Sequence, residues 1–141
     1  MDDDEAAVLA ANRIFYDAFE RRDLDAMSEL WERSPTAVCT HPGWATLRGW
    51  SQISASFFAL FGGEGTLQFV LTQEEAAVRG DVAWVSVDEN LLGEQGGSTV
   101  AALNVFARRP GGRWRMVAHH GSVVNGPLPT FTPRQNENPG D

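Results

Sequence analysis

The sequence predicts an α+β fold, a cone-shaped α+β barrel in which three N-terminal helices pack on a strongly curved, mainly antiparallel sheet. Two observations predict it. The first half of the 141-residue chain carries apolar residues three and four positions apart, which is helical spacing. The second half is rich in β-branched and aromatic residues and is divided by turns that contain glycine or proline. Because such a sheet closed by helices leaves a conical hollow, we expect a small-molecule pocket.

The first helix is expected over about residues 4–22, where one apolar stripe recurs at helical spacing. The stripe consists of Val8, Ala11, Ile14, Phe15, Ala18 and Phe19. Asp23 is expected to cap a second, shorter helix, and Pro35 ends the connection after it. A brief strand at residues 37–40 then meets a proline- and glycine-containing turn at residues 41–44.

A third helix is expected from Trp50, because helical apolar spacing returns there and Gly62-Gly63 supplies a stop. Turn residues then separate four consecutive antiparallel strands. Their expected extents are 67–79, 82–92, 99–109 and 113–124. We therefore predict a single domain over residues 1–124, followed by an irregular tail at residues 125–141.

The charge and cysteine content exclude several classes of partner and site. The chain holds 19 acidic and 11 basic residues, and its net charge of −8 repels nucleic acid and anionic membrane surfaces. Cys39 is the single cysteine, so neither an intrachain disulfide nor a cysteine-rich zinc site is expected. With no signal-like segment and no apolar run of about 18 residues, the sequence predicts a cytoplasmic protein that does not cross a membrane.

Several local strings carry a family resemblance. They are FYDAFERRDLDAM at residues 15–27, VCTHPGW at 38–44, LRGW at 47–50, GDVAWV at 80–85 and RWRMVAHHGS at 113–122. In content and order they resemble the nuclear-transport-factor-two-like superfamily, in particular its SnoaL-like members and ketosteroid-isomerase relatives. The resemblance spans about residues 6–124 and implies the fold described above. It leaves the function open, because the superfamily includes isomerases, cyclases, dehydratases, oligomerisation modules and binding domains.

The resemblance also suggests catalytic positions. Ketosteroid isomerases carry a carboxylate base just before a proline at the end of the first strand, and His41 occupies that place here, which makes it the candidate base. The place of their oxyanion-hole tyrosine falls on Phe15, with Tyr16 expected to point elsewhere. The place of their protonated aspartic acid falls on Asn104, whose amide is expected to donate to a carbonyl oxygen.

Alternation along the second long strand places Trp84, Asp88 and Asn90 on one face. The kinase association domain of the same superfamily implies pocket positions at Asn90, Asn104 and residues 119–121, so we expect a polar cluster of Asp88, Asn90 and Asn104. A hydrated or dimer-facing strand surface is the alternative that the sequence leaves open.

His119 and His120 are neighbours on one strand and must point to opposite faces. The register favours His119 as the pocket residue, whereas a bulge would favour His120. Trp44 is expected at the pocket mouth because it follows a flexible turn. The residues expected to contact a ligand are Phe15, Trp44, Phe57, Trp84, Asn90 and His120.

The leading hypothesis is a protein that binds a small apolar, carbonyl-bearing or polycyclic ligand and transfers a proton as an isomerase, cyclase or dehydratase does. Its expected catalytic residues are His41, Asn104, Asp88 and His119. No spaced ligand motif predicts a metal, and no cofactor is expected. The alternative hypothesis is a non-catalytic dimerisation or accessory domain. Under either hypothesis a homodimer through the sheet face is expected.

Overall fold

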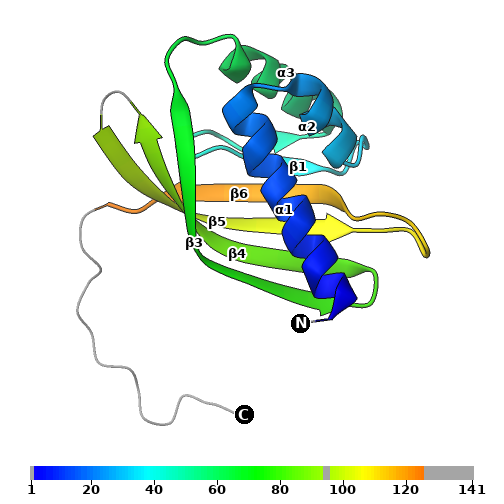
Figure 1. The fold of residues 1–141 in the computed structure, drawn as a ribbon. Helices are drawn as coiled ribbons and strands as arrows, with labels where there is room; N and C mark the ends of the chain where they lie inside the picture. Colours follow the sequence, from blue (N-terminus) through cyan, green and yellow to red (C-terminus); the bar gives the residue numbers. More distant parts are fainter. Residues whose placement is uncertain (1, 94–95, 126–141) are drawn as a thin grey trace.

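The computed structural model describes residues 2–93 and 96–125, which form three helices and one six-stranded sheet. The helices are α1 (Asp3–Arg21), α2 (Leu24–Leu30) and α3 (Trp50–Phe61). The strands are β1 (Val38–Thr40), β2 (Leu47–Arg48), β3 (Leu67–Arg79), β4 (Val82–Gly93), β5 (Gly96–Ala107) and β6 (Arg115–Val123). Figure 1 shows α1 laid across one face of the sheet, with α2 and α3 close to β1. The predicted α+β fold is confirmed, and the predicted tail beyond residue 125 lies outside the described residues.

Side-chain caps explain where the first two helices begin. The Asp2 carboxylate accepts a hydrogen bond from the Glu5 backbone N–H, and the Asp23 carboxylate accepts one from Ala26. Each cap satisfies an amide that has no partner within its helix. The predicted cap at Asp23 is therefore confirmed, and it fixes the residue at which α2 begins after the chain turns back from α1.

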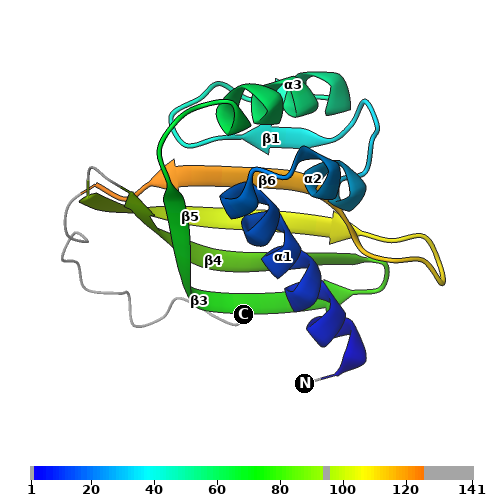
Figure 2. The ribbon, with the colours of Figure 1, turned by 45° about the horizontal axis from the view of Figure 1, so that its top comes forward.

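The strand order is β2-β1-β6-β5-β4-β3, and Figure 2 shows β1, β6, β5, β4 and β3 lying side by side in this order. All neighbouring pairs are antiparallel except β1 and β6, which are parallel. The parallel pairing places Cys39 opposite His119. The end of β1, and with it His41, is thereby brought next to the middle of β6. Strand β2 was not predicted, because two residues are too short for a periodic pattern.

A bulge interrupts β3 between Thr72 and Glu75. Gln73 adopts a left-handed conformation with φ 57°, which L-residues adopt at some cost. One extra residue reverses the alternation, so that Glu74 points toward α1 although it would otherwise point outward. The bulge therefore places the Glu74 carboxylate on the helix-covered face of the sheet.

The core lies between the helices and one face of the sheet. Its largest fully buried side chains include Phe15, Met27, Trp31, Ile53, Phe57, Phe106 and Met116. The other face of the sheet is uncovered and exposes Val70, Trp84, Leu92 and Leu103. Only one sheet face is thus available for a helix-covered pocket. Within the described ranges, no helix is long and apolar enough to cross a membrane.

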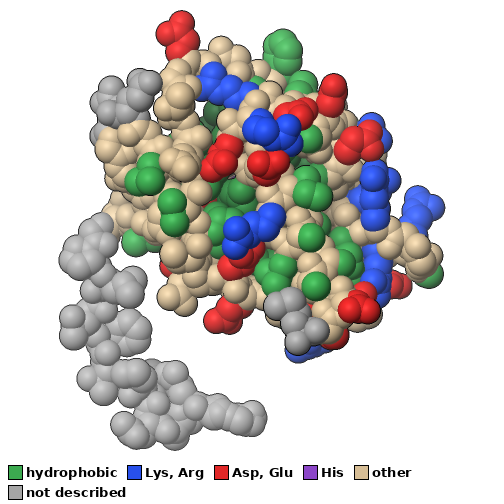
Figure 3. All heavy atoms as spheres, viewed as in Figure 1, with side chains coloured by type: hydrophobic (Ala, Val, Ile, Leu, Met, Phe, Trp, Pro, Cys, Tyr) green, Lys and Arg blue, Asp and Glu red, His purple; other side chains and the backbone are tan. Residues whose placement is uncertain are grey.

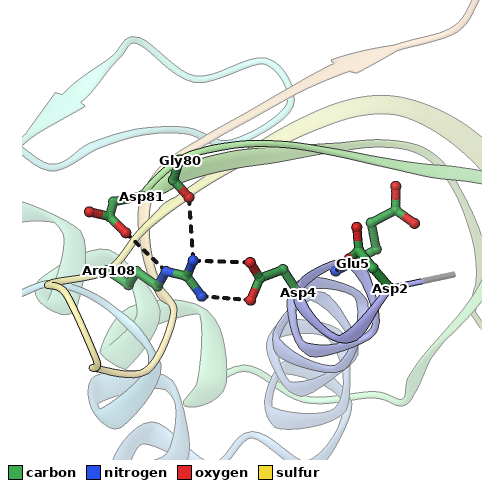
Figure 4. Close-up of polar contacts among 6 residues, drawn as sticks. All are labelled: Asp2, Asp4, Glu5, Gly80, Asp81 and Arg108. Carbon is green, nitrogen blue, oxygen red and sulfur yellow. Dashed lines mark hydrogen bonds and ion pairs between the residues drawn. The ribbon is translucent and has the colours of Figure 1, made fainter.

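Arg108, just after β5, ties together the end of the sheet opposite α3 (Figure 4). Its guanidinium donates to both carboxylate oxygens of Asp4, at 2.7 and 3.0 Å, and to Asp81 at 3.1 Å. It also lies over the Trp114 ring, 4.3 Å from the centroid. These contacts hold the first turn of α1 against the β3–β4 turn. Over the face shown in Figure 3, acidic and basic side chains are interspersed with hydrophobic ones.

Candidate functional site

A cavity of about 200 Å³ lies between α1, α3, the turn after β1 and the covered face of the sheet. It is lined by Phe15, Phe19, His41, Pro42, Trp44, Leu60, Leu67, Phe69, Glu89, Leu91 and His119. Most of this lining is apolar. Three titratable residues, His41, Glu89 and His119, converge on it, and each is less than 5% exposed. Convergent buried titratable groups in an apolar cavity are the usual mark of a functional site.

A larger groove of about 630 Å³ runs between residues 32–34 and the β5–β6 hairpin. Every residue that lines it is exposed or half-buried, and five of them are arginines that face solvent. Burial is what strengthens polar interactions and shifts pKa values. We therefore regard the smaller cavity as the candidate site.

Glu89 supplies the carboxyl group of the site. It comes from β4, in an otherwise apolar inward row that contains Val85 and Val87. Its Oε2 atom accepts a 2.6 Å hydrogen bond from the Tyr16 hydroxyl. Burial raises the pKa of the Glu89 carboxyl to about 7, outweighing the Tyr16 hydrogen bond, which lowers it. Near neutral pH this carboxyl can therefore both accept and return a proton.

Asn104 holds the groups around Glu89 in place. Its Nδ2 donates to the Tyr16 hydroxyl oxygen at 3.0 Å and to Asn12 Oδ1 at 2.8 Å. Its Oδ1 lies 2.5 Å from His119 Nδ1. Both amide hydrogens are thus engaged within the protein. The expected donation from Asn104 to a ligand carbonyl is wrong for this geometry, since no hydrogen remains to donate.

His119 projects from β6 into the interior, where its ring lies 4.7 Å from that of Phe15. Burial lowers its pKa to about 3, so the imidazole is neutral at neutral pH. His120 points to the uncovered face, opposite Leu103 on β5. Of the two neighbouring histidines, His119 is therefore the one that lines the cavity.

His41 lies at the turn after β1 and is also neutral, because burial lowers its pKa to about 4. Its Nε2 is 2.9 Å from Ser56 Oγ, and the Ser56 hydroxyl donates to the Ile53 carbonyl oxygen at 2.7 Å. Because the only hydroxyl hydrogen is used in that way, Ser56 must accept from His41. The hydrogen of His41 is thus on Nε2, and its Nδ1 carries a lone pair. Cys39 is 3.9 Å from Nδ1, and burial raises the pKa of its thiol to about 12.

The predicted polar cluster of Asp88, Asn90 and Asn104 is wrong, because β4 turns its other row of side chains inward. Asp88, Asn90 and Trp84 lie on the uncovered face, whereas Asn104 is fully buried on the covered one. The Asn90 amide accordingly bonds to the neighbouring strands of the outer surface, through Thr72 and Thr99 among others.

The predicted aromatic lining is divided among three places, of which Trp84 on the uncovered face is the first. Phe15 and Trp44 line the cavity, and Trp44 lies at its mouth, 43% exposed, with its ring 4.9 Å from that of His41. Phe57 is fully buried behind them, with ring centroids 6.1 Å from Phe15 and 5.2 Å from His41. It supports the lining residues without belonging to them.

Sequence reasoning missed five polar residues that build the site. They are Asn12, Tyr16, Ser56, Glu74 and Glu89. Tyr16 was expected to point away, yet it is buried beside Phe15, because α1 packs on α2 at one side and on β3 at the other. Glu89 carried a usable signal, since it alternates with Val85, Val87 and Leu91, and a carboxylate in an apolar row is seldom without a function. Among the residues described, no cluster of three or more potential metal ligands is found.

Comparison with known proteins places this geometry in a family. A family model described as a SnoaL-like domain matches residues 8–126. A candidate dehydratase of the NTF2-like family from Streptomyces avermitilis is 36% identical, with a TM-score of 0.79 over 87% of this chain and 97% of the other. A candidate calcium/calmodulin-dependent protein kinase type II association domain from Thiobacillus denitrificans is 35% identical, with a TM-score of 0.70 over 82% and 94%.

A curated relative, the F-box protein SKIP8 of Arabidopsis thaliana, is 30% identical over 118 residues. The match covers 84% of this chain and 50% of the relative, so the chain spans about half the length of that protein.

Proposed function

The chain belongs to the SnoaL-like domain family, and from this premise we propose that it binds a small apolar molecule in the cavity beside α1 and catalyses proton transfer on it. Glu89 is the acid–base group. The observation that carries the proposal is the buried Glu89 carboxyl, which faces an apolar cavity and is held there by the Tyr16 hydroxyl. The candidate dehydratase at 36% identity supports the same class of chemistry.

Proton transfer by Glu89 follows from its environment. A carboxyl with a pKa of about 7 is a far better base than an ordinary glutamate, yet it is partly ionised at neutral pH. It takes a proton from a carbon made acidic by a neighbouring polar group, and then returns it to the same molecule. The Tyr16 hydrogen bond orients the carboxylate, and Phe15 and Phe69 help to exclude water from the reacting atoms.

His41 and His119 lie in the same cavity and complete the polar part of the site. With a pKa of about 4, His41 is a weaker base than Glu89, so we assign it to ligand positioning through its unprotonated Nδ1. His119 has the same role on the β6 side. Asp88 has no part in the proposal because it lies on the uncovered face.

The volume of the cavity limits the size of the ligand. At about 200 Å³ it is smaller than the roughly 300–1,000 Å³ of sites for drug-sized ligands. This favours a single-ring or short branched ligand over a polycyclic one. Trp44, half exposed at the mouth, is the side chain that such a ligand passes on entry.

Glu89→Gln tests the catalytic role, because glutamine keeps the shape and an acceptor oxygen but cannot take the proton. The assay is deuterium incorporation from D2O into 2-hydroxycyclohexanone, followed by NMR. General acid–base catalysis typically contributes about 10²–10⁴-fold, and we expect a loss of that size. Asp88→Asn, one residue away on the uncovered face, is the matched control and should keep full activity. Equal exchange rates in wild type and Glu89→Gln would refute the assignment.

We propose as a second function that two copies associate through the uncovered sheet face. Three apolar side chains support it, because Val70, Trp84 and Leu103 are each more than a third exposed on the neighbouring strands β3, β4 and β5. The 35% identity to a candidate association domain supports it as well. Such an interface leaves the cavity free, since the two features lie on opposite faces of the sheet.

A further inference from the structure

We infer that the cavity selects ligands that bring hydrogen-bond donors, namely small hydroxyl- or amine-bearing molecules, over ligands of the same shape that offer only a carbonyl or ether oxygen. The inference rests on the proposed use of the cavity as a ligand site. It follows from a line of side-chain hydrogen bonds that begins at the β3 bulge and fixes which atoms of the cavity accept.

The first link is the ion pair between Glu74 and Arg13, whose closest atoms are 2.7 Å apart. A carboxylate paired with a guanidinium only accepts hydrogen bonds. Glu74 Oε2 lies 2.8 Å from the amide nitrogen of Asn12, so that Asn12 nitrogen must donate. This fixes the orientation of the Asn12 amide, with its oxygen directed to the interior.

The orientation of the Asn12 amide in turn helps to fix the Asn104 amide on β5 and the tautomer of His119 on β6. Asn12 Oδ1 accepts from Asn104 Nδ2 at 2.8 Å, which places the oxygen of Asn104 toward His119. Because that oxygen can only accept, the nitrogen it faces, His119 Nδ1, must carry the ring hydrogen. In the neutral imidazole the lone pair is then on Nε2.

Besides His41 Nδ1, which has Cys39 Sγ 3.9 Å away, two acceptors are consequently left open in the cavity while Glu89 is ionised. Within the described residues, His119 Nε2 and Glu89 Oε1 have no hydrogen-bond partner, and neither belongs to the fully buried polar atoms without one, which are the indole nitrogens of Trp31 and Trp114. Both residues line the cavity, so both atoms reach its space. Among the lining side chains of the described residues, the donor that stays free while Glu89 is ionised is the Trp44 indole at the mouth.

The ligand must therefore supply hydrogens. A hydroxyl or amine that donates to His119 Nε2 or to the Glu89 carboxylate satisfies a buried acceptor. A carbonyl oxygen in the same place leaves both acceptors unsatisfied and adds a repelling dipole. Sites built to hydrogen-bond a ligand hydroxyl discriminate strongly against analogues that lack it.

Binding of matched pairs tests the inference. The probes are cyclohexanol against cyclohexanone and phenol against anisole, measured at pH 8 by ligand-observed NMR titration of the full chain. We expect the hydroxyl compound of each pair to bind at least tenfold more tightly. Equal or tighter binding of the ketone and the ether would overturn the donor requirement while leaving the ligand site intact. If none of the four probes binds, the proposed ligand site itself fails.

A second measurement tests the line of hydrogen bonds without any ligand. The ¹⁵N shifts of the His119 ring report which nitrogen carries the hydrogen, and we expect Nδ1 to be protonated in the wild type. In Glu74→Gln the amide can present either a hydrogen or an oxygen to Asn12, so the Tyr16 hydroxyl alone orients the Asn104 amide. We therefore expect a detectable fraction of the other His119 tautomer and a weaker preference for cyclohexanol. Glu75→Gln, the next residue on the outer face, should change neither. A wild-type His119 protonated on Nε2 would contradict the mechanism.

Discussion

At the scale of single residues, burial decides which groups of the cavity are charged. Glu89, His41 and His119 are all buried. Burial raises the pKa of Glu89 and lowers the pKa of both histidines, so it favours the neutral form of each. Tyr16 is buried too, and its hydroxyl keeps its proton as a donor to Glu89 because burial and that carboxylate both raise its pKa. Both histidines and Tyr16 are therefore uncharged near pH 7, and Glu89, with a pKa of about 7, is the lining group that is partly ionised there.

Glu89→Gln should stabilise the fold at alkaline pH. The folded-state pKa of Glu89 is about 7, against a usual 4.5, so the folded chain keeps a proton that the unfolded chain loses between these values. Stability then falls by about 3 kcal/mol as pH rises through that window, a loss that glutamine does not suffer. Urea denaturation should show that the free energy of unfolding of Glu89→Gln, taken relative to wild type, is higher at pH 8 than at pH 4.5 by about that amount.

The Asp88→Asn variant controls for removal of an acid from the same strand, and its stability relative to wild type should change far less between the two pH values. His41 and His119 titrate in both proteins, so their contributions cancel in the comparison. A constant difference between Glu89→Gln and wild type across pH would show that the carboxyl ionises without penalty.

At the scale of elements, the parallel pairing of β1 with β6 and the bulge in β3 assemble the site from distant parts of the chain. The first brings His41 beside His119, with ring centroids 6.4 Å apart. The second turns Glu74 toward α1. The packing of the turn after β1 against β6 depends on one glycine, because a Cβ on Gly121 would lie 3.0 Å from Val100 and 3.2 Å from Pro42.

Gly121→Val should disturb the turn that carries His41. The added side chain meets Val100 on β5 and the Pro42 ring together, and overpacking of this kind costs about 1–3 kcal/mol. We expect lower thermal stability and weaker ligand binding. Gly93→Ala is the control, since a Cβ there has only ordinary contacts, and it should leave binding unchanged. Unaltered melting temperature and binding in Gly121→Val would contradict the packing argument.

The limits of prediction from sequence also lie at this scale. Periodicity gave α3 and β3 with their observed bounds, because a long run of spaced residues specifies its own period. Alternation sorted the side chains of β4 into two rows correctly but did not say which row faces the helices. Both rows mix apolar and polar residues, so Trp84 and Asp88 were assigned to the interior in place of Val85 and Glu89. Which row faces inward is decided by the packing of β4 beneath α1, and a contact between segments so far apart in the chain cannot be read from the local sequence pattern.

At the scale of the whole molecule, the sheet separates the two surfaces to which we assign the proposed functions. The covered face holds the cavity, and the uncovered face exposes apolar side chains of the kind that form contacts between subunits. The net charge of −8 is spread over a surface on which both signs occur, as Figure 3 shows for one side. Such a charge disfavours unspecific association, so a stable contact between copies requires an apolar patch.

Leu103→Glu should separate the copies. Leu103 is 44% exposed in the middle of the uncovered face, and a carboxylate there faces its own image across a two-fold contact. Light scattering after gel filtration should give a dimer for the wild type and a monomer for the variant. Phe58→Glu, on α3 and 72% exposed, removes an apolar side chain away from the sheet and should leave the dimer intact. A wild-type chain that is monomeric at all concentrations would rule out this interface.

The bulge at Gln73 makes the site sensitive to a kind of mutation that side-chain comparison overlooks. Loss of a single codon there would leave every other amino acid unchanged, yet it would restore an unbroken pleat and swing Glu74 to solvent. Arg13 and Asn12 would lose their partner, and the tautomer of His119 would be held through Tyr16 and Asn104 alone. A one-residue gap in β3 between two homologues is thus grounds to suspect that their substrates differ.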